Sequence, residues 1–418
     1  MRTLRFLLAA SPLVPALLLS VSPVQAGPVS DQPPVAAIEA WVAKPEAARR
    51  IDDPALARPL SRAEADRALA LLGGEHLRAT AERYADAVAA KQITIGDKTL
   101  KWESKTFGNA APGKRSLWIS MHGGGNAEPA VNDQQWRNQI RLYEPAEGIY
   151  LAPRAPTDSW NLWHEGHIDP LFQALIDAQV AINGVDPDRV YLMGYSAGGD
   201  GVWQLAPRMA DRFAAAAMMA GHPNESSVLG LRNLPFAIFM GGADAAYDRN
   251  RIAADKTAEL DRLHAADPDG YVHMSRIYPG LPHWMDRKDA EALPWMAGFT
   301  RNPWPKRIVW LQDDVTHDRF YWLHIPDAAA AKAGDEIVAS VEGQVITLTG
   351  TVPAGTELRL SDRLLNLDRP VKVIVNGRTV HSGKVARTGL AIEQSLRERE
   401  DVASVATAVV RVDRGGGR

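Results

Sequence analysis

Cysteine is absent from this sequence of 418 residues. Its absence excludes disulfides, a cysteine nucleophile, thiolate metal sites, c-type haem attachment and a lipidated N-terminal cysteine. Charge of either sign is also not in excess, since the net charge is −3, which gives no electrostatic case for nucleic-acid binding. The hydrophobic fraction of 46% and charged fraction of 23% are those of an ordinary globular protein, which argues against wholesale disorder or a fibrous repeat.

Long hydrophobic runs are likewise missing, apart from a short one at the N-terminus. Arg2 and Arg5 precede the apolar run Phe6–Leu19, which two prolines interrupt, and Val24–Ala26 has the small–x–small pattern of a signal-peptidase site. The run is too short and too broken for a membrane span of about 20 residues. We therefore expect residues 1–26 to be a cleavable signal peptide, and the mature chain to be periplasmic or secreted with no integral membrane segment; an uncleaved anchor is the alternative.

The chain length suggests two or three domains. Changes in residue composition and hydrophobic pattern divide the chain into five segments. We expect a signal peptide (1–26), an N-terminal helical region (27–98), an α/β domain (99–305), a β-rich C-terminal domain (306–413) and a disordered basic tail (414–418). In the helical region, Arg62–Ala90 carries an apolar stripe that Gly73-Gly74 interrupts. A hairpin is expected around Gly96-Asp97.

The α/β domain alternates apolar strand-like runs with amphipathic helices. The expected strands are Ser116–Met121, Gly148–Pro153, Arg189–Tyr195, Ala214–Ala220, Phe236–Met240 and His273–Tyr278. The expected helices are Pro170–Asn183, Asp200–Met209 and Arg249–Ala266. Such alternation predicts an α/β fold, with a doubly wound and mostly parallel sheet covered by helices on both faces.

The C-terminal part instead shows short strand-like runs between turn residues. They are Ile308–Leu311, Phe320–Leu323, Ile337–Val341, Val345–Gly350, Leu358–Leu360 and Val371–Val375, with one helix at Leu390–Arg399. Asn376-Gly377 is a strong two-residue hairpin signal. Trp310, Tyr321 and Trp322 are aromatic enough to stack on a carbohydrate or polymer, but a β-sheet core explains them more simply.

A possible nucleophile lies where a strand turns into a helix. Gly194-Tyr195-Ser196-Ala197-Gly198 has the pattern Gly-x-Ser-x-Gly directly after the apolar run that ends at Tyr195. A serine held on such a sharp turn leaves no room for side chains at the flanking glycines. This context makes Ser196 the candidate nucleophile, whereas the bare pattern would be weak.

A glycine-rich run supplies the second element of such a site. His122-Gly123-Gly124-Gly125 directly follows the expected strand Ser116–Met121. Glycines there let backbone N–H groups face a developing oxyanion, so we expect an oxyanion hole from Gly123, Gly124 and Ala197. The run lacks the Lys-Ser/Thr of a P-loop and the spacing of a dinucleotide fingerprint, which argues against nucleotide binding.

An acid and a histidine then follow the serine, each after an expected strand. Asp244 comes after Phe236–Met240, and His283 comes in the loop after His273–Tyr278. His283 is the candidate base and Asp244 the acid that orients it. Asp248, one short turn later, is the alternative acid.

Together, the His122–Gly125 run, the Gly194–Gly198 motif, Asp244 and His283 resemble the α/β-hydrolase fold superfamily. The resemblance covers about Leu100–Arg301, roughly half of the chain. Within the superfamily the chain is most similar to serine esterases of the polyhydroxybutyrate-depolymerase and dienelactone-hydrolase type. Too few residues precede the first strand for the N-terminal propeller of prolyl-oligopeptidase peptidases, and the β-rich appendage is outside the superfamily's pattern.

Several other side chains fall near the same sheet edge. Trp160, Trp163, His164, His222 and Trp284 are candidates for substrate binding, with a packed aromatic cluster as the alternative for the tryptophans. His164-Glu165-Gly166-His167 lacks the spacing of the zincin motif, so no metal site is expected.

The combined pattern predicts a serine hydrolase that cleaves carboxylic esters through an acyl-enzyme on Ser196, without a cofactor. The expected substrate is a small-molecule or polymeric ester, with no nucleic-acid partner, and the sequence leaves the oligomeric state open. The same catalytic groups would serve a serine peptidase or acyl-aminoacyl hydrolase. A third possibility is a catalytically silent protein that binds a wall polymer through its β-rich domain.

Overall fold

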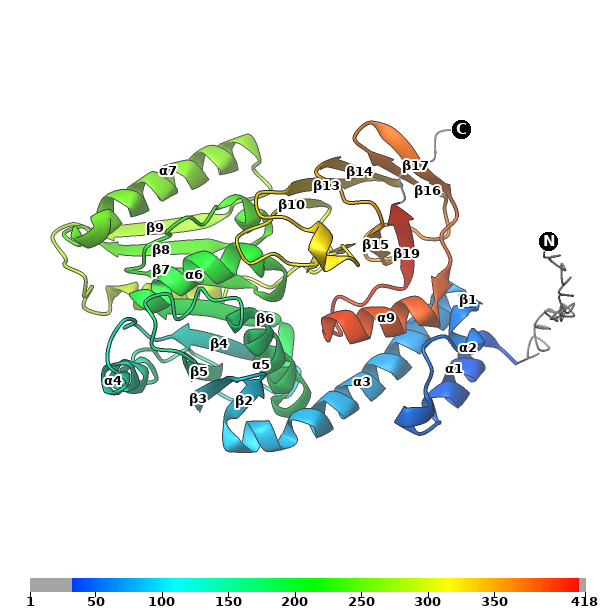
Figure 1. Cartoon of the computed structure of the whole chain (residues 1–418), viewed down its shortest axis with the longest axis horizontal. Helices are drawn as coiled ribbons and strands as arrows, with labels where there is room; N and C mark the ends of the chain where they lie inside the picture. Colours follow the sequence, from blue (N-terminus) through cyan, green and yellow to red (C-terminus); the bar gives the residue numbers. More distant parts are fainter. Residues whose placement is uncertain (1–31, 413–418) are drawn as a thin grey trace, which may run out of the picture.

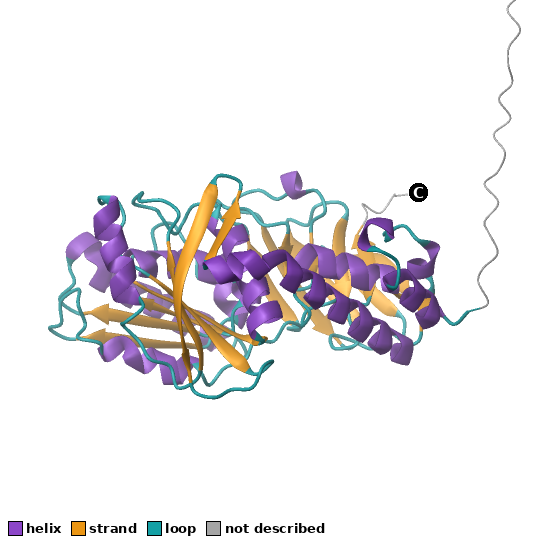
Figure 2. Ribbon diagram, turned by 90° about the horizontal axis from the view of Figure 1, so that it is seen from below, coloured by secondary structure: helices purple, strands orange, loops and turns teal. Residues whose placement is uncertain are grey.

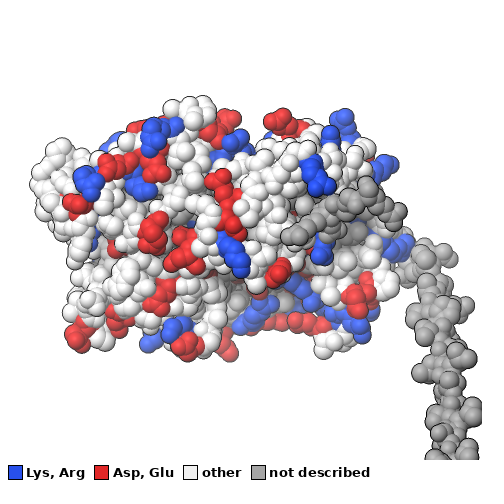
Figure 3. Space-filling view, turned by 45° about the horizontal axis from the view of Figure 1, so that its top comes forward, with Lys and Arg blue, Asp and Glu red and all other residues white. Residues whose placement is uncertain are grey.

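The computed structural model describes residues 32–412. The expected signal peptide at 1–26 and the expected tail at 414–418 lie outside this range. Within it, no helix combines the length and apolar character needed to cross a membrane. The face in Figure 3 carries basic and acidic side chains interspersed, rather than a patch of one sign.

The α/β domain is built on a sheet of eight strands, and the six strands from β4 to β9 run parallel, so the sheet is mostly parallel as predicted. The order across the sheet is β2-β3-β5-β4-β6-β7-β8-β9 (Figure 1). The strands are β2 (Gln92–Ile95), β3 (Lys98–Phe107), β4 (Arg115–Met121), β5 (Gly148–Arg154), β6 (Val185–Tyr195), β7 (Ala215–Met219), β8 (Phe236–Gly241) and β9 (His273–Tyr278). The strand β3 runs antiparallel to both of its neighbours, to β5 and to β2, with which it forms the expected hairpin around Gly96-Asp97. The carboxyl ends of β4 to β9 therefore share one edge.

Helices cover both faces of this sheet because successive strand residues point to opposite sides. On one face, Leu117, Ile119 and Leu192 pack with α5 (Ile168–Asn183), α6 (Ala197–Arg208) and α7 (Arg249–Ala266). On the other, Trp118, Tyr191 and Met193 pack with α8 (Ala292–Met296). The helices α4 (Pro129–Gln139) and α8 were not anticipated, since α4 is polar and α8 is one short turn.

The helix α3 (Arg62–Ala90) runs beneath both the sheet domain and the β-rich domain (Figures 1 and 2). Ser61 and Glu64 form a capping box that begins it. Its predicted bounds are confirmed, and the helix is continuous through Gly73-Gly74, where its apolar stripe is interrupted. Packing against α1 (Pro34–Val42), α5 and α9 (Gly389–Arg399) outweighs the cost of two helical glycines.

The N-terminal helices share a core with the C-terminal end of the chain. Ile38, Trp41 and Leu72 pack against Ile392 and Leu396. The short strand β1 (Pro59–Leu60), which follows α2 (Pro54–Ala57), pairs with β18 (Arg387–Thr388). The first helices and the C-terminal helix α9 of the described residues 32–412 thus share one core.

The β-rich domain contains two sheets. One has the order β10-β13-β14-β16-β17 and the other β11-β12-β15-β19. Their strands are β10 (Arg307–Leu311), β11 (Arg319–Phe320), β12 (Leu323–His324), β13 (Glu336–Glu342), β14 (Val345–Gly350), β15 (Thr356–Leu360), β16 (Val371–Val375), β17 (Arg378–Gly383) and β19 (Ala408–Val412). The expected hairpin at Asn376-Gly377 joins β16 to β17. The expected strand Phe320–Leu323 is instead two strands, because Tyr321 takes a left-handed turn with φ of 52°.

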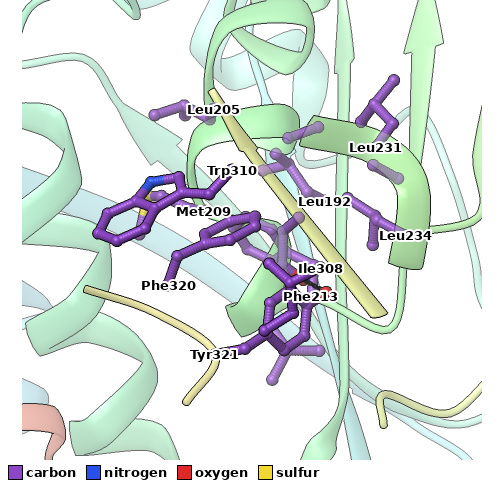
Figure 4. Packing of buried hydrophobic residues seen from close by; sticks show 14 of the residues in the cluster. Leu192, Leu205, Met209, Phe213, Leu231, Leu234, Ile308, Trp310, Phe320 and Tyr321 are labelled. Atoms are coloured by element: carbon purple, nitrogen blue, oxygen red, sulfur yellow. Dashed lines mark hydrogen bonds between the residues drawn. The ribbon is translucent and has the colours of Figure 1, made fainter. Parts of the chain in front are cut away.

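A continuous hydrophobic core joins the β-rich domain to the sheet domain. Ile308, Trp310 and Phe320 pack against Met209 and Phe213 at the end of α6 (Figure 4). Trp310, Tyr321 and Trp322 are all buried there, so they serve as core residues. The β-rich domain thereby packs directly against the helix that follows Ser196.

A buried arginine ties the same two domains together electrostatically. Arg301 donates to the carboxylate of Asp401 at 2.7 Å, to Asp188 at 2.8 Å and to the carbonyl of Asp211 at 2.8 Å. Asp401 is itself buried and also lies 3.3 Å from Arg212. Removing one partner from such a cluster leaves a buried charge uncompensated.

We therefore expect Arg301→Ala to lower the free energy of unfolding by about 3–5 kcal/mol, measured by urea denaturation. The matched control is Arg251→Ala, because Arg251 is exposed and pairs with Asp248 and Asp255 on the surface. Because surface ion pairs contribute little, that change should leave the free energy of unfolding close to the wild-type value. Equal losses in the two variants would contradict the proposed importance of the buried cluster.

Candidate active site

The turn between β6 and α6 holds Ser196 in a strained backbone conformation, with φ of 57° and ψ of −123°. Two neighbouring glycines permit this turn, because the backbone at each of them lies too close to another backbone segment for a side chain to fit. A Cβ on Gly194 would lie 2.2 Å from the carbonyl oxygen of Gly198, and one on Gly198 would lie 2.2 Å from that of Met121 in β4. The strain and the missing side chains together present the Ser196 hydroxyl at the carboxyl edge of the sheet.

The structure brings Ser196, His283 and Asp244 together. His283 Nε2 lies 2.9 Å from Ser196 Oγ, and His283 Nδ1 lies 2.6 Å from Asp244 Oδ2. The carboxylate accepts from Nδ1–H, which leaves Nε2 free to accept the hydroxyl proton. Asp244 is buried, whereas His283 is partly open to solvent. This is the geometry of a nucleophile, a base and an orienting acid.

Of the two candidate acids, only Asp244 contacts His283 within this arrangement. It follows β8 in a tight turn, with its N–H donating to the Gly241 carbonyl at 3.0 Å. Arg249 Nη1 lies 3.6 Å from its second oxygen. Asp248 is exposed, has a left-handed backbone and pairs with Arg251. The local reason is the short turn Ala246–Asp248, which directs Asp248 outward.

Two features hold the loop that carries His283. The Tyr195 hydroxyl donates to the His283 carbonyl at 2.7 Å and accepts from the Met285 N–H at 3.0 Å. A Cβ on Gly241 would lie 2.0 Å from the carbonyl oxygen of Pro282, so only glycine permits this approach. Sequence reasoning did not assign either role, because both depend on contacts between loops far apart in the chain.

The glycine-rich loop lies directly beside Ser196. A Cβ on Gly123 would be 3.0 Å from Ser196 Cβ. The buried ring of His122 bonds to the Gly123 carbonyl through Nδ1 at 2.6 Å and accepts from the Ala155 N–H through Nε2 at 3.1 Å. Since N–H and C=O point opposite ways across a trans peptide, His122 directs the Gly124 N–H away from its own ring. The Ala197 N–H lies at the start of α6, where the first N–H groups have no partner within the helix.

Asn132 in α4 fixes the rest of this loop. Its buried Oδ1 accepts from the Gly125 N–H at 2.9 Å, and its Nδ2 donates to Asp158 at 2.8 Å. Gly124 has φ of 111°, and a Cβ there would meet Asn132 Oδ1 at 2.2 Å. Asn132 was missed because the helix that carries it has no clear apolar periodicity.

Asp200 lies one turn into α6, beneath the nucleophile. Its carboxylate accepts from the His222 N–H at 2.6 Å. Burial raises the pKa of Asp200 to about 6, although this hydrogen bond and Arg249 act in the opposite direction. The contact holds the loop after β7, where the ring of His222 bonds to the Asn224 N–H at 2.9 Å.

The five candidate substrate-binding residues separate into exposed and buried ones. Trp160 and Trp284 are exposed, and His222 is partly exposed. Trp163 is fully buried, and its indole N–H donates to the His122 carbonyl at 2.9 Å. The expectation that Trp163 contacts substrate is therefore wrong, because its ring fills the space beside Gly201 and supports the loop. His164 is buried beneath Trp160, with their ring centroids 5.4 Å apart.

Within residues 32–412, one group of side chains has the spacing of metal ligands: Glu225, Asp313 and Asp314. His164 and His167 are not part of it. Glu165, between them, accepts from the Ser159 hydroxyl at 2.7 Å.

Comparison with known families identifies the domain that carries these groups. Residues 152–310 match the model of the Dienelactone hydrolase family. The sheet domain has the α/β-hydrolase fold. The match confirms the resemblance drawn from the motifs, and with it the predicted class of enzyme, an ester hydrolase. No protein with a curated description matches this chain.

Solved structures similar to this chain include several esterases. A thermostable esterase shares 19% identity over 50% of this chain, with a TM-score of 0.38, and the chain spans 62% of its length. Thermogutta terrifontis esterase 2 shares 17% identity over 50% of this chain and 91% of its own, with a TM-score of 0.35. The feruloyl esterase module from Clostridium thermocellum shares 16% sequence identity over 50% of this chain and 86% of its own length, with a TM-score of 0.36.

The contacts of Gly198 in the α/β-hydrolase predict a severe effect of a single methyl group. In Gly198→Ala, the new Cβ must displace the Met121 backbone, which moves Ser196 relative to His283 and to the glycine-rich loop. We expect kcat/KM for an activated ester to fall by about 100-fold or more.

The control is Gly74→Ala, in the exposed middle of α3, where a Cβ has nothing within 4 Å. It should leave kcat/KM unchanged and raise stability by up to about 1 kcal/mol. Wild-type kinetics in Gly198→Ala would refute the argued geometry of the turn.

His122 predicts a pH dependence of stability. Burial lowers its pKa to about 4 from an ordinary value of 6.5, although the Gly123 carbonyl favours the protonated ring. Between these two values the unfolded chain binds more protons than the folded one, so stability falls as pH falls. In His122→Asn, the loss of unfolding free energy between pH 7 and pH 4.5 should be smaller than in wild type by about 2–3 kcal/mol. Parallel pH profiles for the two proteins would contradict this assignment.

Proposed function

We propose that this protein hydrolyses carboxylic esters through an acyl-enzyme formed on Ser196. The observation that carries the proposal is His283 placed between Ser196 Oγ, at 2.9 Å, and Asp244, at 2.6 Å. The dienelactone hydrolase match supports it independently, since a lactone is a cyclic ester.

In the acylation step, Ser196 Oγ attacks the carbonyl carbon of the ester while His283 Nε2 takes its proton. Buried Asp244 stabilises the imidazolium that forms. The negative charge on the former carbonyl oxygen would be held by the N–H groups of Gly124 and Ala197, with Gly123 providing the close approach. The tetrahedral intermediate collapses, the alcohol leaves, and it takes the proton from His283.

Deacylation repeats these steps with water. His283 removes a proton from a water molecule that attacks the acyl carbon, and collapse of the second intermediate returns the proton to Ser196 Oγ and releases the acid. The partial exposure of His283 leaves a path for this water. These steps use the groups of the chain, the ester and water alone.

We also propose that the chain is exported by the segment 1–26, which lies outside the described residues. The pattern of two arginines, an apolar run and Val24-Gln25-Ala26 supports this proposal. An exported hydrolase without cysteine would be independent of the redox state of its surroundings.

A fluorophosphonate probe tests the nucleophile, because it reacts covalently with an activated serine. We expect labelling of the wild-type protein, no labelling of Ser196→Ala, and a loss of ester turnover of at least about 10⁴-fold in both Ser196→Ala and His283→Ala. Short p-nitrophenyl esters and aminoacyl anilides, tested in parallel, distinguish an esterase from a peptidase.

The acid assignment has a matched control in the same loop. Asp244→Asn should lose activity severely, whereas Asp248→Asn should keep it, because Asp248 contacts Arg251 rather than His283. Labelling that persists in Ser196→Ala, or full turnover in His283→Ala, would overturn the proposed mechanism. Cleavage of anilides in preference to esters would replace the esterase with a peptidase.

A further inference from the structure

Three aromatic side chains are strongly exposed in the described part of the chain, and all three lie near the candidate active site. They are Trp160, 59% exposed, Tyr247, 77% exposed, and Trp284, 47% exposed. Trp284 follows His283 and packs against Tyr195, with ring centroids 5.6 Å apart. Tyr247 covers the guanidinium of Arg249, which contacts Asp244. The Trp160 carbonyl adjoins Gly125 of the glycine-rich loop.

These aromatic residues lie on both sides of the nucleophile. Trp160 follows β5, Ser196 follows β6, and Tyr247 and Trp284 follow β8 and β9, so the sheet order places Ser196 between them. With neighbouring strands about 4.8 Å apart, the strands β5 and β8, which lead into these loops, are separated by about 19 Å. A small ester cannot contact both. Aromatic rings in these positions can stack on the apolar faces of an extended ligand that passes over Ser196.

Hydrogen-bond acceptors continue this surface beyond Trp160. His164, beneath Trp160, has Glu225 and Asp314 among its neighbouring charges. Glu225, Asp313 and Asp314 have carboxylate oxygens within 4.8 Å of one another and line a cavity of about 230 Å³ at the seam between the two domains. Gln204, which donates to Glu225 at 3.1 Å, lies eight residues along α6 from Ser196, about 12 Å along the helix axis.

We propose that the substrate is an acyl ester of an uncharged oligosaccharide, which stacks on Trp160, Tyr247 and Trp284 and donates hydroxyl hydrogen bonds to the carboxylates at the domain seam. This inference rests on the proposed ester hydrolysis at Ser196 and adds the substrate class. It also assigns the β-rich domain a role in substrate binding, since Asp313 and Asp314 belong to the loop after β10.

The three carboxylates at the domain seam favour one class of extended ester over the others. Carboxylates accept hydrogen bonds and donate none when ionised, so they require donors on the ligand. Sugar hydroxyls supply donors and sugar rings supply apolar faces, whereas the repeating units of a polyester carry carbonyl acceptors only. A polyuronate is disfavoured because its carboxylates would meet those of Glu225, Asp313 and Asp314. Arg208, which also lines this cavity, already pairs with Asp169 at 2.7 Å.

The experiment compares ester substrates of matched chemistry and different length on the full chain. The substrates are an O-acetylated xylohexaose, an O-acetylated methyl xyloside, an O-acetylated galacturonate hexamer and a hexamer of 3-hydroxybutyrate. We expect kcat/KM for the acetylated xylohexaose to exceed that for the single sugar by about tenfold or more, and to exceed those for the other two hexamers.

Variants locate the source of this preference. Trp160→Ala should lower the ratio of hexamer to single-sugar kcat/KM by about tenfold, and Trp160→Phe should restore part of it, because the ring is kept. Asp314→Ala should raise KM for the hexamer several-fold, with a smaller effect on kcat. The matched controls are Ile95→Ala, an exposed apolar residue of the β2–β3 hairpin, and Asp255→Ala, an exposed acid of α7, and neither should change the ratio.

Three outcomes would overturn the inference. Equal kcat/KM for hexamer and single sugar shows that the aromatic residues do not bind an extended chain, and preference for the hydroxybutyrate hexamer assigns a polyester instead. If a chelator added to the wild-type protein raises KM for the hexamer as much as Asp314→Ala does, the carboxylates bind a metal ion instead. In each case Ser196-dependent turnover of p-nitrophenyl acetate would leave the proposed ester hydrolysis standing, whereas turnover that survives Ser196→Ala would remove that function itself.

Discussion

The close approach of three backbone segments around Ser196 is the constraint on which the candidate active site depends. Gly198 lies against the Met121 carbonyl of β4, and Gly194 lies against Gly198 itself, so β4, β6 and the start of α6 meet without intervening side chains. This contact sets the strained conformation of Ser196 and places the glycine-rich loop beside it. The site is therefore a property of the packed sheet edge, and the backbone strain is supported by the rest of the domain.

Around this contact, buried polar groups fix the loops. His122 and Asn132 hold the glycine-rich loop, Tyr195 holds the loop of His283, and Asp200 holds the loop after β7. Asn132, Tyr195 and Asp200 each bond to a backbone group of another segment, and His122 bonds both to the adjacent Gly123 carbonyl and to the Ala155 N–H of the loop after β5. The candidate catalytic groups are thus positioned by neighbours that take no part in the proposed proton transfers, as preorganised sites require.

The β-rich domain is coupled to this arrangement by packing and by charge. Its tryptophan-rich face continues the core at the end of α6, and the cluster of Arg301, Asp401 and Asp188 bridges the same boundary. A rigid boundary of this kind allows a loop of one domain to contribute to a surface of the other. The loop with Asp313 and Asp314 occupies that position, next to Glu225 of the α/β-hydrolase domain.

The sequence by itself determined the parallel sheet and the order of its strands along the chain, and it singled out Ser196, Asp244 and His283, because strand periodicity and glycine motifs are local signals. It did not predict α4, the division of Phe320–Leu323 into two strands, or the burial of Trp163, which depend on packing partners distant in the chain. The tertiary structure alone decided that Asp244 rather than Asp248 contacts His283, and that Trp160 and Trp284 are exposed on opposite sides of Ser196. The physical reason is that a local sequence pattern specifies the position of a side chain on its own helix, strand or turn. Its contacts with other elements are specified only when those elements pack together.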